Sequence, residues 1–184
     1  MHIFRWKELE AVPWKNGQGT TREIAKETRA ESIVWRLSIA DVTNDGSFSH
    51  FPGMRRILTV VEGNGMSLLG PDKILQADWG APVEFDGATP ITSRLKDGPL
   101  RDLNLIFDPQ ICSGHISAVA GGESRHLHCK DKQVFAVFCM NGSVGLKVHE
   151  RLHKGDTAIL EAGTCDFKLD AASRALLVMI ERHV

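Results

Sequence analysis

Polar and apolar residues alternate with a period of two along most of this 184-residue chain, and helical periodicity is almost absent. The apolar positions are rich in β-branched and aromatic side chains, and Gly, Pro, Asn and Asp interrupt the pattern at close spacing. Short strands joined by tight turns fold as a sandwich, a jelly roll or a barrel, so the sequence predicts an all-β protein. The expected strands cover 20–26, 33–42, 55–62, 66–69, 73–77, 83–86, 90–95, 101–108, 114–120, 133–140, 143–149, 156–160, 165–169 and 175–182. One short helix is expected over 6–12, because Pro13 ends it.

Two segments, 58–69 and 135–146, suggest an internal repeat. Each is an apolar strand, an Asn-Gly turn and a return strand, which predicts a hairpin. Their few identities fit either a duplication or chance, because all hairpins use the same turn residues. All four Trp and all seven Pro precede residue 110, and all four Cys follow it. We therefore expect two β-barrel halves, 1–110 with a ligand cavity and 111–184 with a mainly structural role, with exchange of strands between them left open.

The charge balance argues against two classes of partner. Lys and Arg number 22 and Asp and Glu number 23, which gives a net charge of −1. Nucleic-acid binding and polybasic membrane binding both need a basic surface, so neither is expected. The first residues carry charges where a secretory signal is apolar, and no apolar stretch is long enough to span a membrane. A cytoplasmic protein with reduced cysteines is the expectation.

Three predicted strands carry polar groups on a partly apolar face. Arg36 and Ser38 share one face of 33–42, Asp102 and Asn104 share one face of 101–108, and Arg56 alternates with apolar residues in 55–62. Buried polar groups must be paired with one another or face a ligand. Two alternatives follow: a closed internal network, or a cavity in which an Arg pair recognises an anion and Asp and Asn fix its orientation.

A glycine-rich segment precedes the first long strand. Gly17 and Gly19 are followed by Thr20 and Thr21, which favour a strand, whereas phosphate-binding loops lead into a helix. The segment is therefore either a turn that buries Trp14 or a loop that lays Trp14, Lys15 and Asn16 over the mouth of a cavity. The two interpretations are about equally supported by the residues alone.

The same segment begins a series of motifs that resembles the HutD/Ves family. The motifs are WKNGQGTTREI at 14–24, WRLSIAD at 35–41, GSFS at 46–49, FPGMRR at 51–56, EG at 62–63, VEFDG at 83–87 and GPLRDLNL at 98–105. The resemblance covers nearly the whole chain. It implies a bacterial bicupin, often linked to histidine utilisation, and it favours the cavity over the closed network.

The resemblance to cupins also raises the question of a metal. Metal-binding cupins use a His-x-His pair, a nearby Glu and a later His, but here Phe48 stands at the first position and Arg55 or Arg56 at that of the Glu. Arginine has no lone pair to give to a metal, so the first half is expected to lack one, and no cofactor is expected. His126 and His128 form the right doublet at the wrong place, which leaves a weak alternative metal site against exposed loop histidines.

These features predict a metal-free bicupin that binds a small organic anion. Arg36 and Arg56 would bind a carboxylate, and Trp14, Phe48 and Phe85 would supply aromatic walls. The resemblance suggests a histidine-degradation intermediate such as N-formylglutamate or urocanate, and a regulatory or accessory role.

Two alternatives of other classes stay open. One is a cupin enzyme that acts on a small carboxylate, either with a metal or by acid–base chemistry at His50, Asp102 or Glu23. The other is a structural or stress-related protein with a vestigial cavity. Cupins often dimerise through sheet edges, which makes a homodimer an option that no residue pattern decides.

Overall fold

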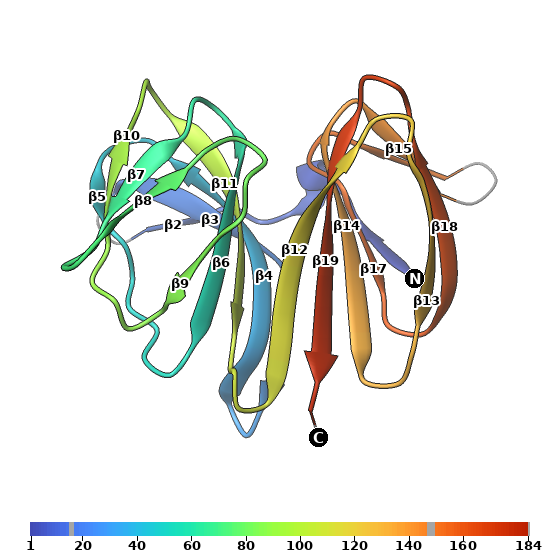
Figure 1. Cartoon of the computed structure of the whole chain (residues 1–184), viewed down its shortest axis with the longest axis horizontal. Helices are drawn as coiled ribbons and strands as arrows, with labels where there is room; N and C mark the ends of the chain where they lie inside the picture. The colour runs from blue at the N-terminus through green and yellow to red at the C-terminus, as the bar shows by residue number, and fades with distance from the viewer. Residues whose placement is uncertain (15–16, 147–149, 184) are drawn as a thin grey trace. The chain divides into compact units, whose positions relative to one another are not determined.

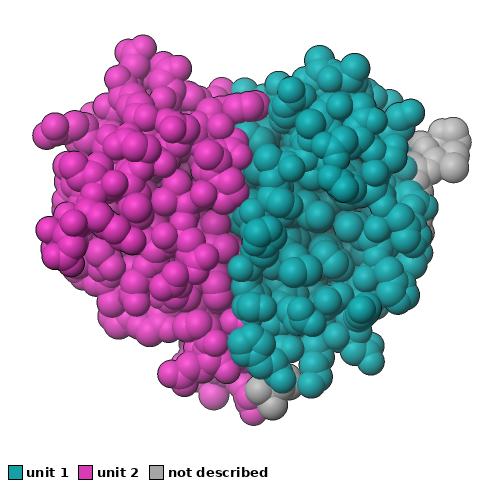
Figure 2. Space-filling view, in the orientation of Figure 1, with its two compact units in different colours: residues 1–9, 113–184 teal, residues 10–112 magenta. Residues whose placement is uncertain are grey.

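The computed structural model describes residues 1–14, 17–146 and 150–183. These residues form two compact β units, which Figure 2 shows in different colours. Unit 2 is the continuous segment Glu10–Cys112, and unit 1 combines Met1–Leu9 with Ser113–Val184. Each unit contains two sheets, and the labels used below are those of Figure 1. The predicted all-β class is confirmed.

Unit 2 carries the residues of most interest for function. Its six-stranded sheet has the order β2 (Val12–Pro13), β3 (Gly19–Arg29), β4 (Ser32–Val42), β11 (Leu100–Phe107), β6 (Arg55–Glu62) and β9 (Val83–Asp86). Its four-stranded sheet has the order β5 (Gly46–Ser47), β10 (Thr92–Leu95), β7 (Met66–Leu69) and β8 (Ile74–Ala77). Apolar side chains of both sheets, among them Leu58, Val60, Met66 and Leu68, form a buried core.

Unit 1 repeats this plan with other strands. One sheet has the order β1 (His2–Phe4), β17 (Thr157–Leu160), β14 (Gln133–Asn141), β19 (Arg174–Arg182) and β12 (Cys112–Ala120). The other has the order β13 (Ser124–Cys129), β18 (Gly163–Leu169), β15 (Ser143–Gly145) and β16 (Arg151–His153). All four cysteines are buried. Burial raises the pKa of the Cys139 thiol to about 12, which makes it a packing residue rather than a nucleophile.

The N-terminal segment differs from the expected helix over 6–12, and it belongs to the other unit than the residues that follow it, an exchange that the sequence left open. Strand β1 pairs with β17, so Met1–Leu9 belongs to unit 1. Only Trp6–Glu8 is helical, as one 3-10 turn. The Asp156 carboxylate accepts hydrogen bonds from the Trp6 backbone N–H at 3.0 Å and from Arg5 at 2.8 Å. Arg5 and Leu9, on either side of this turn, have extended backbones. Tertiary contacts thus outweigh the helix propensity of the segment.

The two segments expected to be hairpins are instead connections between sheets. Strand β6 pairs with β11 and β9, whereas β7 pairs with β10 and β8 in the other sheet. The same holds for β14 and β15 in unit 1. Gly65 and Gly142 turn the chain at these points with positive φ angles of 92° and 69°. An Asn-Gly pair marks a sharp turn, but the burial of each apolar face decides which strands pair.

Strand β13 is absent from the strands that the sequence predicts. Its histidines were expected in a loop, but Ser124–Cys129 pairs with β18 along its whole length. Only Leu127 and Cys129 are buried in it, so the strand has little of the β-branched signal on which the prediction depends. In the part of the chain that the structure describes, we find no helix with the length and apolar character that a membrane span requires.

Candidate functional site

A cavity of about 720 Å³ lies within unit 2. Its deepest lining residues are polar and almost fully buried, and its outer lining residues, such as Val12, Glu23 and Ser47, are exposed. The lining comes from β2 and the residue that follows it, from β3, β4, β5, β6 and β11, and from the chain between β5 and β6. The residues are Val12, Pro13, Trp14, Thr21, Glu23, Arg36, Ser38, Ala40, Ser47, Phe48, Ser49, Phe51, Arg56, Asp102, Asn104 and Ile106.

Strand alternation explains which side chains reach the cavity. On β11 the lining residues are Asp102, Asn104 and Ile106, at every second position. In the register of the sheet, Asn104 lies opposite Ser38 of β4, and Ile106 lies opposite Arg56 of β6. The polar face inferred from the sequence is therefore the face that lines the cavity. Binding of a ligand by these residues stays a prediction.

Arg56, Asn104 and Asp102 form a buried chain of hydrogen bonds at the bottom of the cavity. The Arg56 Nη2 donates to Asn104 Oδ1 at 2.8 Å, and its Nη1 donates to the Ser49 carbonyl at 3.3 Å. The Asn104 amide in turn donates to Asp102 Oδ1. Arg56 is 6% exposed and Asp102 is 1% exposed. The internal network that the sequence allowed therefore exists, with Asn104 between the two charged groups.

This network is not complete. Three buried polar atoms of the lining residues have no partner in the described structure: Arg36 Nε, Arg56 Nε and Asp102 Oδ2. A buried donor or acceptor without a partner costs about 1–3 kcal/mol, so such atoms are rare unless something else satisfies them. The cavity thus contains both an internal network and three buried atoms, two donors and one acceptor, that a ligand could bind.

Aromatic rings surround the Arg56 guanidinium. Its central carbon lies 5.1 Å from the Phe48 ring centre, 5.1 Å from that of Phe85 and 5.5 Å from that of Phe51. Cation–π contacts of this kind favour a charged guanidinium away from water. Phe85 was expected in the cavity wall. It is instead 4% exposed and lies against Arg56 outside the lining.

Phe51 is a lining residue that the sequence pattern does not indicate. A turn over Phe51–Met54 places it, with the Met54 N–H donating to the Phe51 carbonyl at 3.1 Å and Gly53 at a φ of +79°. The Phe51 N–H also donates to the Gly87 carbonyl at 2.8 Å. A Cβ on Gly87 would stand 2.6 Å from the Phe51 carbonyl oxygen, so glycine is required there. The Phe-Pro-Gly motif signals this turn but not the direction of the ring.

Burial sets the charge states at the bottom of the cavity. It lowers the pKa of Arg56 to about 10, although the Asp102 charge opposes this shift, so Arg56 stays protonated at neutral pH. Burial also raises the pKa of Asp102 to about 7, with Arg56 opposing and Asp41 adding to the shift. The pKa of Arg36 is lowered by burial and raised by Glu23, with a net lowering. Near pH 7 the two guanidiniums thus face a carboxyl group that is only partly ionised.

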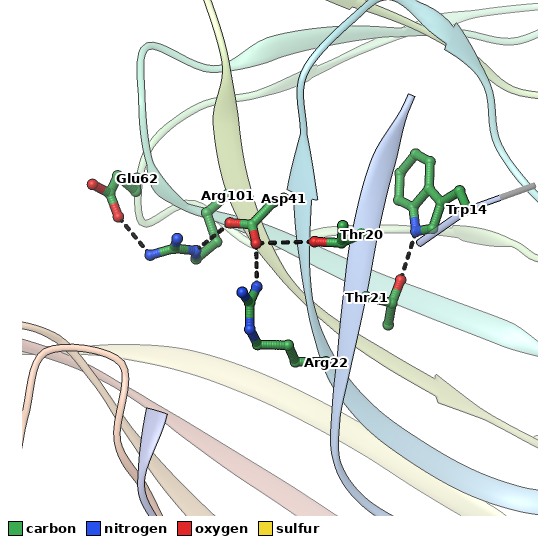
Figure 3. A network of polar contacts seen from close by, with 7 residues as sticks. All are labelled: Trp14, Thr20, Thr21, Arg22, Asp41, Glu62 and Arg101. Atoms are coloured by element: carbon green, nitrogen blue, oxygen red, sulfur yellow. Dashed lines mark hydrogen bonds and ion pairs between the residues drawn. The ribbon is translucent and has the colours of Figure 1, made fainter. Parts of the chain in front are cut away.

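Trp14 lies at the cavity and is held by β3. Its Nε1 donates to the Thr21 hydroxyl at 2.7 Å, as Figure 3 shows. A Cβ on Gly19 would stand 2.3 Å from the Asp41 carbonyl oxygen and 3.2 Å from the Trp14 ring, so a glycine is needed for this approach. The glycine-rich segment therefore leads into a strand and positions Trp14. Lys15 and Asn16, expected over the cavity mouth, lie outside the described residues.

The other face of β3 carries a charged network that Figure 3 also shows. Asp41 accepts hydrogen bonds from Thr20 at 3.1 Å, from Arg101 Nε at 2.7 Å and from Arg22. Arg101 also bonds Glu62 at 2.8 Å. Burial alone would raise the pKa of Asp41, but the bonds and charges of Arg101 and Arg22 outweigh it and lower the pKa. This network fastens β3, β4, β11 and β6 together behind the cavity.

The histidine doublet of unit 1 lies on exposed β13. His126 Nδ1 is 2.5 Å from Asp166 Oδ1 on β18, and both side chains are more than half exposed. Across residues 1–14, 17–146 and 150–183, no group of three or more His, Cys, Asp or Glu side chains is placed to hold a metal ion. His50 is exposed and is not among the lining residues of the cavity, whereas Asp102 and Glu23 are.

Two cupin-like β units, one of them with an Arg-lined cavity, define a bicupin. Comparison with known proteins agrees with this class. A bacterial pirin from Escherichia coli, solved in complex with nickel(II), matches 100% of this chain and 99% of its own with a TM-score of 0.69 at 11% identity. The family model named HutD matches residues 6–177, and the chain belongs to the HutD family.

Individual relatives agree with the family. The structure of HutD from Pseudomonas fluorescens SBW25, obtained in a formate condition, is 30% identical, covers 100% of this chain and 99% of that chain, and has a TM-score of 0.85. An uncharacterised 21.2 kDa protein in the hutC 3′ region of Pseudomonas putida is 40% identical over 116 residues, 60% of each chain. Protein Ves from Cronobacter sakazakii is 30% identical over 118 residues, 63% of this chain and 65% of that one. The match thus spans less than two thirds of these two relatives.

Proposed function

We propose that this protein binds a small organic anion, in particular a carboxylate, in the cavity of unit 2. The observation that carries the proposal is the set of unpartnered buried atoms. Six buried side-chain polar atoms lack a partner among the described residues, and three of them, Arg36 Nε, Arg56 Nε and Asp102 Oδ2, belong to residues that line this one cavity. Two of the three are guanidinium donors, and guanidinium groups recognise carboxylates with paired hydrogen bonds.

The same residues disfavour a resident cation in this cavity. Arg56 is almost fully buried and stays protonated, and Arg36 contributes a second positive charge. A cation placed between them would be repelled, whereas an anion would neutralise them. The proposal is therefore a metal-free binding site, with aromatic side chains as apolar walls.

Membership of the HutD family supports a role in histidine utilisation. The Pseudomonas putida relative is named after the region of hutC, and the family is HutD. We accordingly include histidine-degradation intermediates that carry a carboxylate, such as N-formylglutamate and urocanate, among the expected ligands. The role that fits a binding site of this kind is regulatory or accessory.

The test is a thermal-shift titration with a panel of carboxylates at constant ionic strength. Ligand at about one hundred times its Kd stabilises the folded state by about 2.7 kcal/mol, so Tm should rise clearly for at least one member. Arg36→Gln should abolish the rise, whereas the matched control Arg94→Gln, at an exposed position of β10 outside the cavity, should keep it. Unchanged Tm for the wild-type protein across the panel would remove the proposal.

A second function, acid–base catalysis on the bound carboxylate, has one observation in its favour. Two carboxyl groups, Asp102 and Glu23, line the cavity, and burial brings the pKa of Asp102 to about 7, a value suited to proton transfer at neutral pH. Incubation of the carboxylate panel with the protein in D₂O, followed by NMR, tests it. Incorporation of deuterium at carbon that depends on Asp102 would favour an enzyme over a binding protein.

A further inference from the structure

We infer that Asp102 selects among anions, and that the cavity takes carboxylates which also carry a hydrogen-bond donor, such as hydroxy, amino or amido acids. This inference rests on the proposed anion binding and adds a second recognition element to it. The two guanidinium groups would bind the carboxylate of the ligand, and the unpartnered oxygen of Asp102 would accept a hydrogen bond from a neighbouring O–H or N–H group of the same ligand.

The hydrogen bonds around Asp102 leave one defined acceptor. Asn104 donates to Oδ1, and Oδ2 is buried without a partner. The Asn104 amide is itself held, because its Oδ1 accepts from Arg56 at 2.8 Å. Asn104 therefore cannot turn to offer a second N–H group to Asp102 without losing the bond from Arg56.

The immediate neighbours do not supply the missing donor. In the sheet, Asp102 lies opposite Ala40 of β4 and opposite Val60 of β6, and neither side chain can donate a hydrogen bond. Ionised carboxylates accept only, so Oδ2 needs a donor from outside the protein when Asp102 is charged. A simple carboxylate in the same place would bring more acceptors and no donor.

This arrangement favours anions that carry a hydrogen-bond donor over anions that lack one. A ligand with a suitably placed donor satisfies a buried charged acceptor, and hydrogen bonds to charged groups contribute about 1.5–3 kcal/mol. A ligand without the donor leaves Oδ2 unsatisfied, so nothing offsets the repulsion between its negative charge and that of Asp102. Sites that hydrogen-bond one polar group of a substrate reject analogues that lack it for this reason.

The experiment compares three matched dicarboxylates on the wild-type protein by isothermal titration calorimetry at pH 8, where Asp102 is mostly ionised. Malate has a hydroxyl donor, succinate has none, and 2-methoxysuccinate keeps the oxygen but lacks the hydrogen. We expect malate to bind at least about tenfold more tightly than either of the others. Equal binding of all three overturns the inference and leaves anion binding intact. No binding of any of them at millimolar concentrations overturns anion binding itself.

Asp102→Asn identifies the responsible residue. With Asn104 still donating to the oxygen, the new amide group places N–H donors where Oδ2 stood, so the preference for malate should disappear or reverse. The control Asp72→Asn, an exposed turn carboxyl outside the cavity, should keep it. If Glu23→Gln removes the preference and Asp102→Asn does not, the assignment to Asp102 is wrong. The wild-type comparison decides the ligand class even if Asp102→Asn does not fold.

Discussion

The guanidinium carbon of Arg56 lies 5.5 Å from the centre of the Phe51 ring, and that of Arg36 lies at the same distance from the same ring. One aromatic side chain thus contacts both cationic groups of the cavity. Two guanidiniums repel each other, and Arg36 does lower the pKa of Arg56, after the larger effect of burial. A ring that attracts both offsets part of that repulsion.

Phe51→Leu should therefore weaken anion binding as well as stability. Leucine keeps much of the apolar volume but loses both cation–π contacts, each of about 0.5–2 kcal/mol. We expect the Kd for succinate to rise severalfold in calorimetric titrations. Phe4→Leu, at a partly buried phenylalanine of unit 1, is the control and should leave the Kd unchanged. An unchanged Kd in Phe51→Leu would show that the ring does not position the arginines.

The pKa of Asp102 predicts how stability depends on pH. Its carboxyl titrates at about 7 in the folded protein, above its ordinary value of 3.8, so the folded state holds the proton more tightly than the unfolded state. The protein therefore loses stability as pH rises from about 4 to about 7, by no more than about 4 kcal/mol from this group.

Asp102→Asn removes this loss, because an amide does not titrate. We expect the variant to gain stability relative to wild type as pH rises from 4 to 8, measured by chemical denaturation at each pH. The exposed control Asp72→Asn should follow the wild-type curve in parallel. A constant difference between Asp102→Asn and wild type across this range would contradict the assigned titration.

Binding of succinate should depend on the same proton. The charges that act on Asp102 directly are Arg56 of β6, which is positive, and Asp41 of β4, which is negative. Arg36 of β4 in turn acts on Arg56, and Glu23 of β3 acts on Arg36. Below pH 7 Asp102 is mostly neutral and the ligand meets the arginines alone. Above pH 7 the charge of Asp102 repels the ligand, so the Kd should rise with pH. The limiting slope is about tenfold per pH unit, for a ligand that binds only the protonated form.

Titrations of succinate at pH 6 to 8.5 measure this dependence. Asp102→Asn should flatten the profile, and malate should show a weaker rise than succinate because its hydroxyl donates to the ionised carboxylate. The same slope in Asp102→Asn as in wild type would assign the proton to another group.

A single methyl group at Gly19 should disturb β3, the strand that holds Trp14 at the cavity. A Cβ there would stand 2.3 Å from the Asp41 carbonyl oxygen, which is backbone and cannot move without disturbing the β3–β4 pairing. We expect Gly19→Ala to destabilise unit 2 by about 2 kcal/mol or more in denaturant titrations. In Gly145→Ala the nearest atom would be at an ordinary 3.7 Å, so that control should be nearly neutral.

Among the patterns in the sequence, the alternation of side chains along each strand predicts this site best. The order of residues alone separates Arg36 and Ser38 from their neighbours on β4, and Asp102 and Asn104 from theirs on β11, and all four line the cavity. Alternation fixes the face of a strand but not its partner. The link from Arg56 to Asp102 through Asn104 depends on how β6 and β11 are aligned, which is a property of the folded sheet.

Residues outside regular strands are harder to predict. Phe51 points to the arginines because a Phe-Pro-Gly turn is held by Gly87, thirty-six positions later in the sequence. Phe85 has the alternation of a lining residue, yet it packs against the Arg56 guanidinium, and Arg56 rather than Phe85 lines the cavity. Both outcomes come from packing between distant segments, which local pattern does not contain.

The pairing of β1 with β17 bears on the order in which the protein is made. Strand β1 is synthesised before all of unit 2, but its partner β17, at Thr157–Leu160, is synthesised about 150 residues after it. Unit 2 is one continuous segment, so all its strands are available while the ribosome is still translating unit 1. The cavity can thus be assembled on the nascent chain, whereas β1 can find its neighbour only after unit 2 has been made.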